Sequence, residues 1–392
     1  MQDDSNFNKD NWFSNIIRKP DSGVIKSEYK TPIFIDDDKN YVIKINEILE
    51  KLISDFAVIK DNTLFTEIVC DYQKFIKRVM DFYFQGHIGN AALEMKTYIE
   101  DLIDGSKGIA LSNIKNSIAF NDKEIIISNI KNDKSIDFFR ARVSEHFCEY
   151  KRNEMLHIPF NQREKISSAR FSIQGLPCLY LGTTSYCCWL EMDTPADHQF
   201  NVSAVSVNED MKILNLTLNS CDLEHLLALS NDRKIFQEGL KLWLLALSSS
   251  FVVRQSNRSF KTEYVIPQLI MLAANELNLD GVSYYSKRVK DDRLASMNTV
   301  NLALFAKYNG EEKYSKICKD ILLTPSVNFS MYKQLNYDAT YRADDISPHI
   351  QDTMYPKVIG SFERQYQYSE TKFYSFDKYL LSLKNEMKHM EP

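Results

Sequence analysis

The chain has 392 residues, a length that suits one large domain with an accessory region or two modest domains. Hydrophobic residues make up 44% of the chain and charged residues 26%, which is the balance of a globular protein and excludes disorder over most of its length. The formal net charge of −5 argues against a surface that wraps nucleic acid.

The cysteines and the apolar stretches indicate an intracellular protein. No Cys-x-x-Cys pair occurs and no His pair stands at zinc spacing, so we expect no metal and reduced, mostly buried thiols. The amino terminus lacks the order of a secretory signal, and the apolar stretch 242–253 is interrupted by serines and too short for a membrane span. We therefore expect a soluble, cytoplasmic chain with no membrane contact. The seven cysteines are Cys70, Cys148, Cys178, Cys187, Cys188, Cys221 and Cys318.

The first third of the chain predicts a polar arm followed by helices. Residues 1–40 are polar and weakly periodic, and we expect them to form an arm. Apolar residues then recur at helical spacing over 45–56, 65–83 and 93–103. Gly86 and Gly89 separate the last two helices. Residues 41–134 are therefore interpreted as a helical accessory region.

Beyond residue 135 the pattern predicts a catalytic-sized domain of strands and helices, over residues 135–310. The fold class expected is α+β, and residues 311–392 form a C-terminal extension that we expect to pack on this domain. Strands are predicted at 138–143, 170–173, 178–181, 202–207, 211–216, 282–285 and 300–305, and helices at 223–229, 235–247 and 264–277.

Several common catalytic motifs are absent from the sequence. It contains no Gly-x-x-x-x-Gly-Lys, no Gly-x-Gly-x-x-Gly, no Gly-x-Ser-x-Gly and no His-Glu-x-x-His. Kinase, Rossmann dehydrogenase, serine hydrolase and zincin functions therefore lose their main support.

The first segment that could carry chemistry is Asp-Phe-Phe-Arg-Ala-Arg-Val, residues 137–143. Strand alternation places Arg140 and Arg142 on one face of this predicted strand. A solvated strand face is the plain alternative.

The second segment runs from Met155 to Met192. Arg170 is expected to open a strand and Tyr180 to lie in the returning strand. Thr184 or Ser185 can cap a short apolar helix with Glu191 near its end, a carboxylate that is costly to bury without a partner. An exposed carboxylate is the alternative for Glu191. His157, in a loop with Pro159, either closes over a substrate or is a structural loop histidine.

The third segment is Asp-Gly-Val-Ser-Tyr-Tyr-Ser-Lys-Arg, residues 280–288. Ser286 follows a buried strand, at a strand end where site residues are common. A turn residue is the alternative for this serine, and Arg288 is a secondary candidate for a phosphate contact.

Together these segments resemble the RES domain family over residues 135–305. The matching pieces, in family order, are Phe-Arg-Ala-Arg, Ala-Arg-Phe-Ser, Pro-Cys-Leu-Tyr-Leu-Gly-Thr-Thr, Cys-Trp-Leu-Glu and Asp-Gly-Val-Ser-Tyr-Tyr-Ser. The resemblance implies a fold similar to ADP-ribosyltransferase toxins, activity on NAD, and frequent pairing with an Xre-type antitoxin. The chain departs from compact members of the family in its helical region, its C-terminal extension and the Phe-Ser pair after Arg170, where those members tend to have Trp-Asn.

Carried over by residue, the resemblance assigns catalysis to Arg140, Glu191 and Ser286 and substrate binding to Arg170 and Tyr180. Cleavage of the nicotinamide–ribose bond passes through an oxocarbenium-like cation, which a carboxylate stabilises. Arginine forks suit pyrophosphate oxygens, and a tyrosine can stack on a ring. The serine either binds the nicotinamide amide or orients the glutamate. His157 and Arg288 complete the candidate binding set.

The function expected is therefore an NAD-degrading enzyme, by hydrolysis or phosphorolysis, which acts as a toxin or defence effector. NAD is its substrate, and no cofactor is implied. An ADP-ribosyltransferase that modifies a protein is the first alternative, and a non-catalytic module that senses a nucleotide is the second. An Xre-type antitoxin, another regulatory protein and a second copy of the chain remain open as partners.

The helical region carries none of these candidate residues. We therefore expect residues 41–105 to be dispensable for the chemistry, with roles in control or assembly. The alternative is that these helices complete the core, in which case their removal exposes a large apolar surface.

Overall fold

The computed structural model describes residues 29–36, 40–56, 62–105, 108–120, 137–145, 148–220, 222–223, 226, 233–253, 258–290, 297–310, 312–335, 358–361 and 364–389. The chain groups into two compact units. Unit 1 combines Met1–Lys134 with Lys212–Arg293, and unit 2 combines Ser135–Met211 with Leu294–Pro392. This grouping divides the chain differently from the domain boundaries predicted at residues 40, 134 and 310, which stay a prediction.

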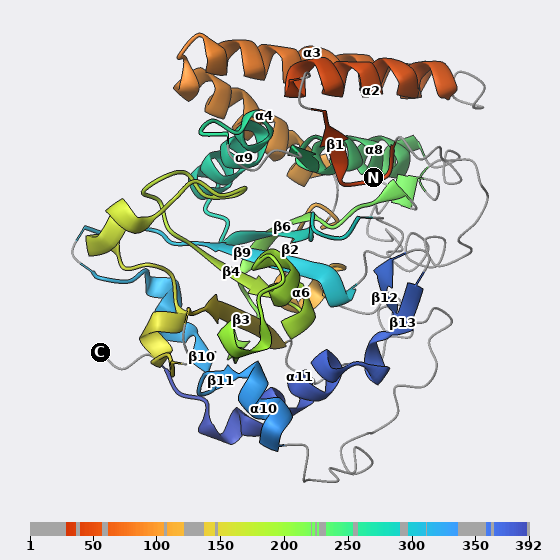
Figure 1. The fold of residues 1–392 in the computed structure, drawn as a ribbon. Coiled ribbons are helices and arrows are strands. Elements are labelled where there is room, and N and C mark those ends of the chain that lie inside the picture. Colours follow the sequence, from red (N-terminus) through yellow and green to blue (C-terminus); the bar gives the residue numbers. More distant parts are fainter. Residues whose placement is uncertain are drawn as a thin grey trace, which may run out of the picture. The chain divides into compact units, whose positions relative to one another are not determined.

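Unit 1 is built mainly from helices. Five of them lie where the sequence predicts helices, at 45–56, 65–83, 93–103, 235–247 and 264–277. α2 and α3 lie side by side in this unit (Figure 1). Gly86 has a φ of +83°, a conformation that suits glycine at the turn between α3 and α4. The helices are α2 (Tyr41–Asp55), α3 (Asn62–Phe84), α4 (Ile88–Gly105), α8 (Arg233–Ser248) and α9 (Val265–Glu276), with 3-10 turns η2 (Ile114–Asn116) and η6 (Thr262–Tyr264).

The strands of unit 1 form a mixed group and a separate pair. β6 (Lys212–Leu216) pairs in parallel with β8 (Gly281–Tyr285) and antiparallel with β2 (Leu111–Asn113). β1 (Ile33–Ile35) pairs in parallel with β7 (Phe251–Val253). The segment predicted as a polar arm therefore contains a strand, whose partner lies more than 200 residues further along the chain.

The helical region shares one core with α8. The hydroxyl of Tyr41 donates to the Ser248 carbonyl oxygen at 2.9 Å, and the hydroxyls of Tyr72 and Ser248 lie 2.5 Å apart. The hydroxyl of Tyr98 donates to the carbonyl oxygen of Lys241 at 3.0 Å. Because α8 belongs to the segment predicted to be the catalytic domain, these buried contacts favour core completion over a dispensable accessory role.

Unit 2 contains an antiparallel sheet with the strand order β10-β5-β3-β4-β9, and β11 also pairs with β5. β3 and β5 pair along seven residues and β4 and β9 along five, whereas β3 and β4 pair only at Phe139 and Gly182. One pair of residues, Phe139 and Gly182, therefore joins the β3–β5 side of this sheet to the β4–β9 side. The strands are β3 (Asp137–Val143), β4 (Cys178–Gly182), β5 (Phe200–Ser206), β9 (Val300–Phe305), β10 (Leu322–Leu323) and β11 (Val327–Asn328).

Short helices complete unit 2 (Figure 1). A strand pair, β12 (Val358–Ser361) and β13 (Arg364–Gln367), also lies in this unit. The helices are α6 (Ser185–Glu191), α10 (Phe329–Leu335) and α11 (Lys372–Ser382), with 3-10 turns η3 (Arg152–Met155), η4 (Phe160–Lys165), η5 (Asp197–Gln199), η8 (Met297–Thr299), η9 (Lys316–Asp320), η11 (Tyr368–Glu370) and η12 (Leu383–Glu386).

Both units combine helices with strands, which confirms the α+β fold class; the ADP-ribosyltransferase-like part of that expectation stays a prediction. The strand predicted at 170–173 is wrong, because Arg170 lies in a tight turn closed by a bridge between Ala169 and Ser172. The helix predicted at 223–229 lies partly outside the described residues. Among the described helices, none is both long and apolar enough to cross a membrane.

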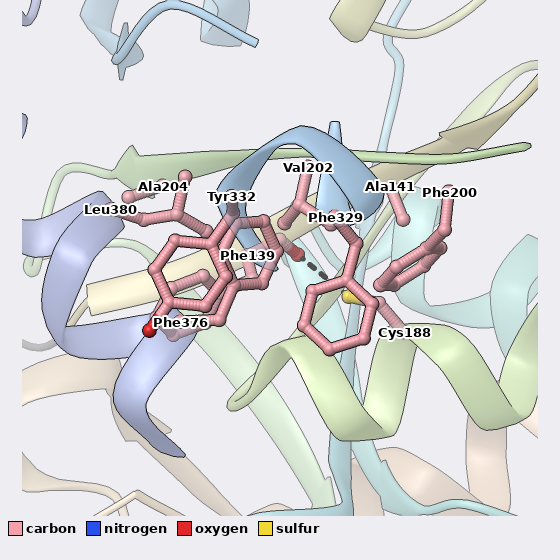
Figure 2. Packing of buried hydrophobic residues seen from close by; sticks show 10 residues of the cluster. All are labelled: Phe139, Ala141, Cys188, Phe200, Val202, Ala204, Phe329, Tyr332, Phe376 and Leu380. Atoms are coloured by element: carbon pink, nitrogen blue, oxygen red, sulfur yellow. Dashed lines mark hydrogen bonds between the residues drawn. The ribbon is translucent and has the colours of Figure 1, made fainter. Parts of the chain in front are cut away.

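Helices α10 and α11, from the C-terminal extension, pack with β3, β5 and α6 around one buried cluster (Figure 2). The alternate residues Phe139 and Ala141 of β3 face this cluster, and Cys188 of α6 donates from its thiol to the Phe139 carbonyl oxygen at 3.2 Å. Each large apolar side chain buried here contributes roughly 1.5–3 kcal/mol. The cluster consists of Phe139, Ala141, Cys188, Phe200, Val202, Ala204, Phe329, Tyr332, Phe376 and Leu380.

A buried carboxylate also links α11 to the first residue of α6. Asp377 is 6% exposed, and its Oδ1 accepts from the Ser185 backbone N–H at 3.0 Å. Its Oδ2 accepts from the Tyr368 hydroxyl at 2.5 Å. Burial raises the pKa of Asp377 to about 7, although both hydrogen bonds act in the opposite direction.

The core of unit 1 predicts the effect of truncation. A chain that begins at Lys131 loses α2, α3 and α4, so the apolar sides of α8 and α9 become exposed and we expect insoluble protein on expression. A control chain that begins at Glu28 keeps every described contact and should remain in the supernatant. Soluble protein from the shorter chain that still cleaves NAD would instead support the accessory role.

The raised pKa of Asp377 predicts a pH dependence of stability. In the unfolded chain this pKa returns to about 4, so between about pH 4 and pH 7 the folded chain binds a proton that the unfolded chain does not. The contribution of Asp377 to the free energy of unfolding therefore falls as the pH rises through this window. Urea denaturation of the parent and of Asp377→Asn should show the variant gaining stability relative to the parent from pH 4 to pH 7. A constant difference between the two proteins would contradict the shifted pKa.

Candidate active site

Arg140 occupies the point where β3 and β4 separate. Alternation along β3 places its side chain on the opposite face from Phe139, which packs against α6. Its Nε donates to the Met155 carbonyl oxygen at 3.1 Å, and one terminal nitrogen donates to the Tyr180 carbonyl oxygen at 3.1 Å. The guanidinium thus bridges β3, β4 and the end of η3 where the two strands no longer pair directly.

Arg142 lies two residues further along the same face of β3. Its terminal nitrogen donates to the Leu156 carbonyl oxygen at 3.1 Å, next to the residue that accepts from Arg140. Its Nε is buried and has no hydrogen-bond acceptor in the described structure. Both arginines therefore hold the loop after η3, which argues against the solvated strand face that the sequence left open.

Neither guanidinium forms an ion pair with a carboxylate among the described residues. Burial lowers the pKa of Arg140 to about 10, and the neighbouring positive charge of Arg142 lowers it further. Burial also lowers the pKa of Arg142. Two half-buried positive charges of this kind favour binding of an anion, because an anion replaces the solvation that burial removes.

Glu191 ends α6 and is half-buried. Its Oε1 accepts from the Asn301 side-chain amide at 2.6 Å. Asn301 is 3% exposed on β9, and the Oδ1 of its side-chain amide accepts from the Cys187 thiol at 3.3 Å. The carboxylate is therefore held in one direction by a buried side chain, which argues against a freely exposed helix-end glutamate.

Asn301 is the residue of this site that sequence reasoning missed. It pairs in register with Gly182, which pairs with Phe139, so it lies in the single row that joins β3, β4 and β9. The signal for it was one amide in the otherwise apolar strand Val-Asn-Leu-Ala-Leu-Phe. A buried amide needs a hydrogen-bond partner, but the strand pattern cannot say which one.

The charges of this site act on a common neighbour, Cys188 of α6. Burial raises the pKa of its thiol to about 12, and the positive charge of Arg140 acts against that rise. The negative charges of Asp377 and Glu191 raise the same pKa further. The charges of Arg140, Glu191 and Asp377 therefore all act on this one thiol.

His157 is fixed by backbone groups on both sides of its ring. Its Nδ1 lies 2.8 Å from the Ile158 carbonyl oxygen, and its Nε2 accepts from the Ser315 backbone N–H at 3.0 Å. The ring is 1% exposed, and burial lowers its pKa, so the neutral form is favoured. This geometry favours the structural interpretation of His157 over a residue that closes on a substrate.

Tyr180 and Arg170 are placed by β4 and by the turn before it. Tyr180 is half-buried on β4, and its backbone accepts the hydrogen bond from Arg140. Arg170 is half-buried in the turn from Ala169 to Ser172 rather than at the start of a strand. Both belong to unit 2 together with Arg140 and Glu191.

Ser286 and Arg288 belong to unit 1. Ser286 is 2% exposed just after β8, and its hydroxyl oxygen accepts from the backbone N–H of Arg288 at 3.2 Å. This is the geometry of a serine that stabilises a turn. Arg288 is exposed. That these two residues join the set of unit 2 stays a prediction.

The thiols and the possible metal ligands are also defined by the structure. The six described cysteines are free, and Cys187, Cys188 and Cys318 are buried. Within the described residues, no cluster of three or more His, Cys, Asp or Glu side chains could hold a metal ion. The site described above therefore consists of arginine, glutamate and asparagine side chains with backbone carbonyls.

The comparisons with known proteins include a similar sequence and a similar solved structure. No family model matches the chain. The curated protein named "Putative toxin YopC", of Bacillus subtilis (strain 168), is 32% identical in an alignment 183 residues long, which covers 43% of this chain and 40% of that relative. Among solved structures, the crystal structure of the M. tuberculosis MbcT-MbcA toxin-antitoxin complex aligns with 15% identity and a TM-score of 0.28, over 52% of this chain and 90% of that chain. The sequence similarity thus extends over less than half of either protein.

Proposed function

We propose that this chain cleaves the nicotinamide–ribose bond of NAD and acts as a toxin or defence effector that depletes the nucleotide. The observation that carries the proposal is the pair of half-buried guanidiniums of Arg140 and Arg142, which bind backbone carbonyls and pair with no carboxylate among the described residues. The pyrophosphate of NAD can supply the negative counter-charge for these two guanidiniums, and a planar guanidinium can donate two parallel hydrogen bonds to phosphate oxygens.

Glu191 supplies the second requirement of this chemistry. As the bond between ribose C1′ and the nicotinamide nitrogen breaks, its electron pair leaves with nicotinamide and positive charge develops on the ribose. A carboxylate held by Asn301 can oppose that charge without first reorganising, which is how a fixed charge lowers a barrier. In this proposal Glu191 acts at the ribose, and the arginines hold the pyrophosphate.

Four further residues take roles that the resemblance to the RES family suggests. Arg170 contacts the phosphates together with Arg140, and Tyr180 stacks on a ring of the substrate. Ser286 binds the nicotinamide amide or orients Glu191, and Arg288 is a secondary phosphate contact. His157 is left out of the binding set, because both of its ring nitrogens contact backbone groups.

The group that accepts ADP-ribose distinguishes NAD degradation from ADP-ribosyl transfer to a protein. Attack on the ribose cation by water gives ADP-ribose with release of a proton, and attack by phosphate gives ADP-ribose 1-phosphate. Transfer to a side chain would make the chain an ADP-ribosyltransferase instead. Incubation of purified protein with labelled NAD, with and without phosphate, separates the three by their products.

The toxin role is supported by the name of the relative, YopC, and by the resemblance of the segments to the RES family. An Xre-type antitoxin, a second copy of the chain and a cytoplasmic location are proposed on the same basis. A non-catalytic module that senses a nucleotide is disfavoured because the sequence keeps every residue type of the set that the resemblance assigns, namely arginine, tyrosine, glutamate and serine.

The role of the carboxylate can be tested by one substitution. Glu191→Gln removes the charge that opposes the developing cation but keeps the shape and one oxygen for Asn301. Turnover of NAD, followed as nicotinamide release, should fall by about a hundredfold or more. Glu164→Gln makes the same change at an exposed position of unit 2 and should turn over NAD as the parent does. Parent-like turnover in Glu191→Gln would rule out this mechanism.

The role of the arginines can be tested by binding measurements. Arg140→Ala and Arg170→Ala should each weaken NAD binding by about 2 kcal/mol, because each removes a charge-assisted contact to a phosphate. Arg140→Lys should restore little, since an ammonium lacks the planar fork. Titration calorimetry with NAD, in chains that also carry Glu191→Gln, measures binding without turnover, and Lys165→Ala serves as a surface control. Unchanged affinity in both alanine variants would show that these residues do not hold the phosphates.

A further inference from the structure

The helix that carries Glu191 is too short to hold its own position. α6 has seven residues, Ser185–Glu191, and isolated helices of this length are unstable in water. The first backbone N–H groups of any helix have no partner inside it. In α6 the Thr184 side chain accepts from the backbone N–H of Cys187 at 3.0 Å. A cap within the segment therefore satisfies one of these groups.

The cap on Ser185 comes from the C-terminal extension. Asp377 of α11, 192 residues further along the chain, accepts the Ser185 backbone N–H at 3.0 Å, and Tyr368 donates to the other oxygen of the same carboxyl group. Asp377 and Tyr368 are both buried. A buried acceptor that has two donors in fixed positions defines where the first turn of α6 begins.

Aromatic contacts place the same two elements against each other. The ring of Phe373 lies 5.4 Å from the ring of Tyr186 and 5.4 Å from that of Trp189, both on α6. These apolar contacts are non-directional, so they favour burial of the helix without fixing its register. The directional part of the contact between α6 and α11 is the hydrogen bonding of Asp377 at 3.0 Å, together with a longer bond at 3.5 Å from the Ser185 hydroxyl to the Phe373 carbonyl oxygen.

From these contacts we propose that Asp377, supported by Tyr368, is a positioning residue for Glu191, so that the C-terminal extension is part of the active site. The inference rests on the NAD cleavage proposed above. Glu191 lies six positions after Ser185, the residue that Asp377 caps, and six positions correspond to a rise of about 9 Å along a rigid helix. A shift of the first turn therefore moves Glu191 relative to Asn301, and misplacement by about 1 Å can reduce turnover up to about a hundredfold.

The test compares substitutions that keep or remove the cap in the full-length chain. Asp377→Ala removes the acceptor, whereas Asp377→Asn keeps an oxygen for the Ser185 N–H. We expect the alanine variant to lose ten- to a hundredfold in kcat while KM for NAD changes less than threefold, and the asparagine variant to stay within threefold of the parent. Glu370→Gln, which removes an exposed charge near Tyr368, is the matched control and should also stay within threefold.

Hydrogen exchange and a double-mutant cycle separate positioning from a general loss of stability. The amides of α6 should exchange faster in Asp377→Ala than in Asp377→Asn, while those of β5 keep their protection. In a chain that already carries Glu191→Gln, Asp377→Ala should cause no further fall in residual turnover, because it acts through the glutamate. Equal kcat in the parent and Asp377→Ala, or an equal loss in the alanine and asparagine variants, would overturn the proposal.

Two outcomes have separate meanings. If Asp377→Ala does not fold, Tyr368→Phe is compared with Tyr374→Phe: a loss of kcat confined to the former supports the proposal, and equal turnover overturns it. If the parent does not cleave NAD at all, the proposed function fails, and the proposed effect of Asp377 on turnover fails with it. The exchange of the α6 amides then still shows whether Asp377, as a positioning residue without a catalytic role of its own, fixes this helix.

Discussion

A helix of seven residues depends on groups outside it, and this dependence governs the candidate site. Thr184 and Asp377 fix the first turn of α6, and Asn301 holds the carboxylate at its last residue. Cys188, in the middle of the helix, docks on β3 through its thiol and the buried cluster. The orientation of Glu191 is thus set by contacts from several parts of the chain, which together fix the position of a short helix.

The second constraint is the narrow connection between β3 and β4. Where the direct pairing of the strands ends, the carbonyl oxygens of β4 need another donor, and Arg140 provides it for Tyr180. A guanidinium used in this way satisfies the backbone but pairs with no carboxylate among the described residues. In the proposed function, the side chain that joins the two strands is therefore also one that holds the pyrophosphate.

Much of the fold follows from local pattern. The helices α2, α3, α4, α8 and α9 and the strands β3, β4, β5, β6, β8 and β9 lie where the periods of 3.6 and 2 predict them, because each element buries one face of its own sequence. The other described strands, which are short or lie at the edges, were not predicted. Thr184 was recognisable as a cap because capping involves neighbours in the chain. The strand expected at Arg170 was wrong because the alternation over four residues could not reveal a turn closed by a bridge between Ala169 and Ser172.

The sequence by itself determined the α+β class and the positions of the main helices and central strands, and it pointed to Arg140 and Glu191 as candidate site residues. Only the tertiary structure decided how those residues are held. β1 pairs with β7, Asn301 reaches Glu191 from 110 residues away, and Asp377 reaches Ser185 from 192 residues away. Local periodicity records which face of an element is buried, but it carries no information about which distant side chain completes a hydrogen bond. Such pairs are set by the packing of whole elements, since a buried polar group takes the partner that the fold brings within reach.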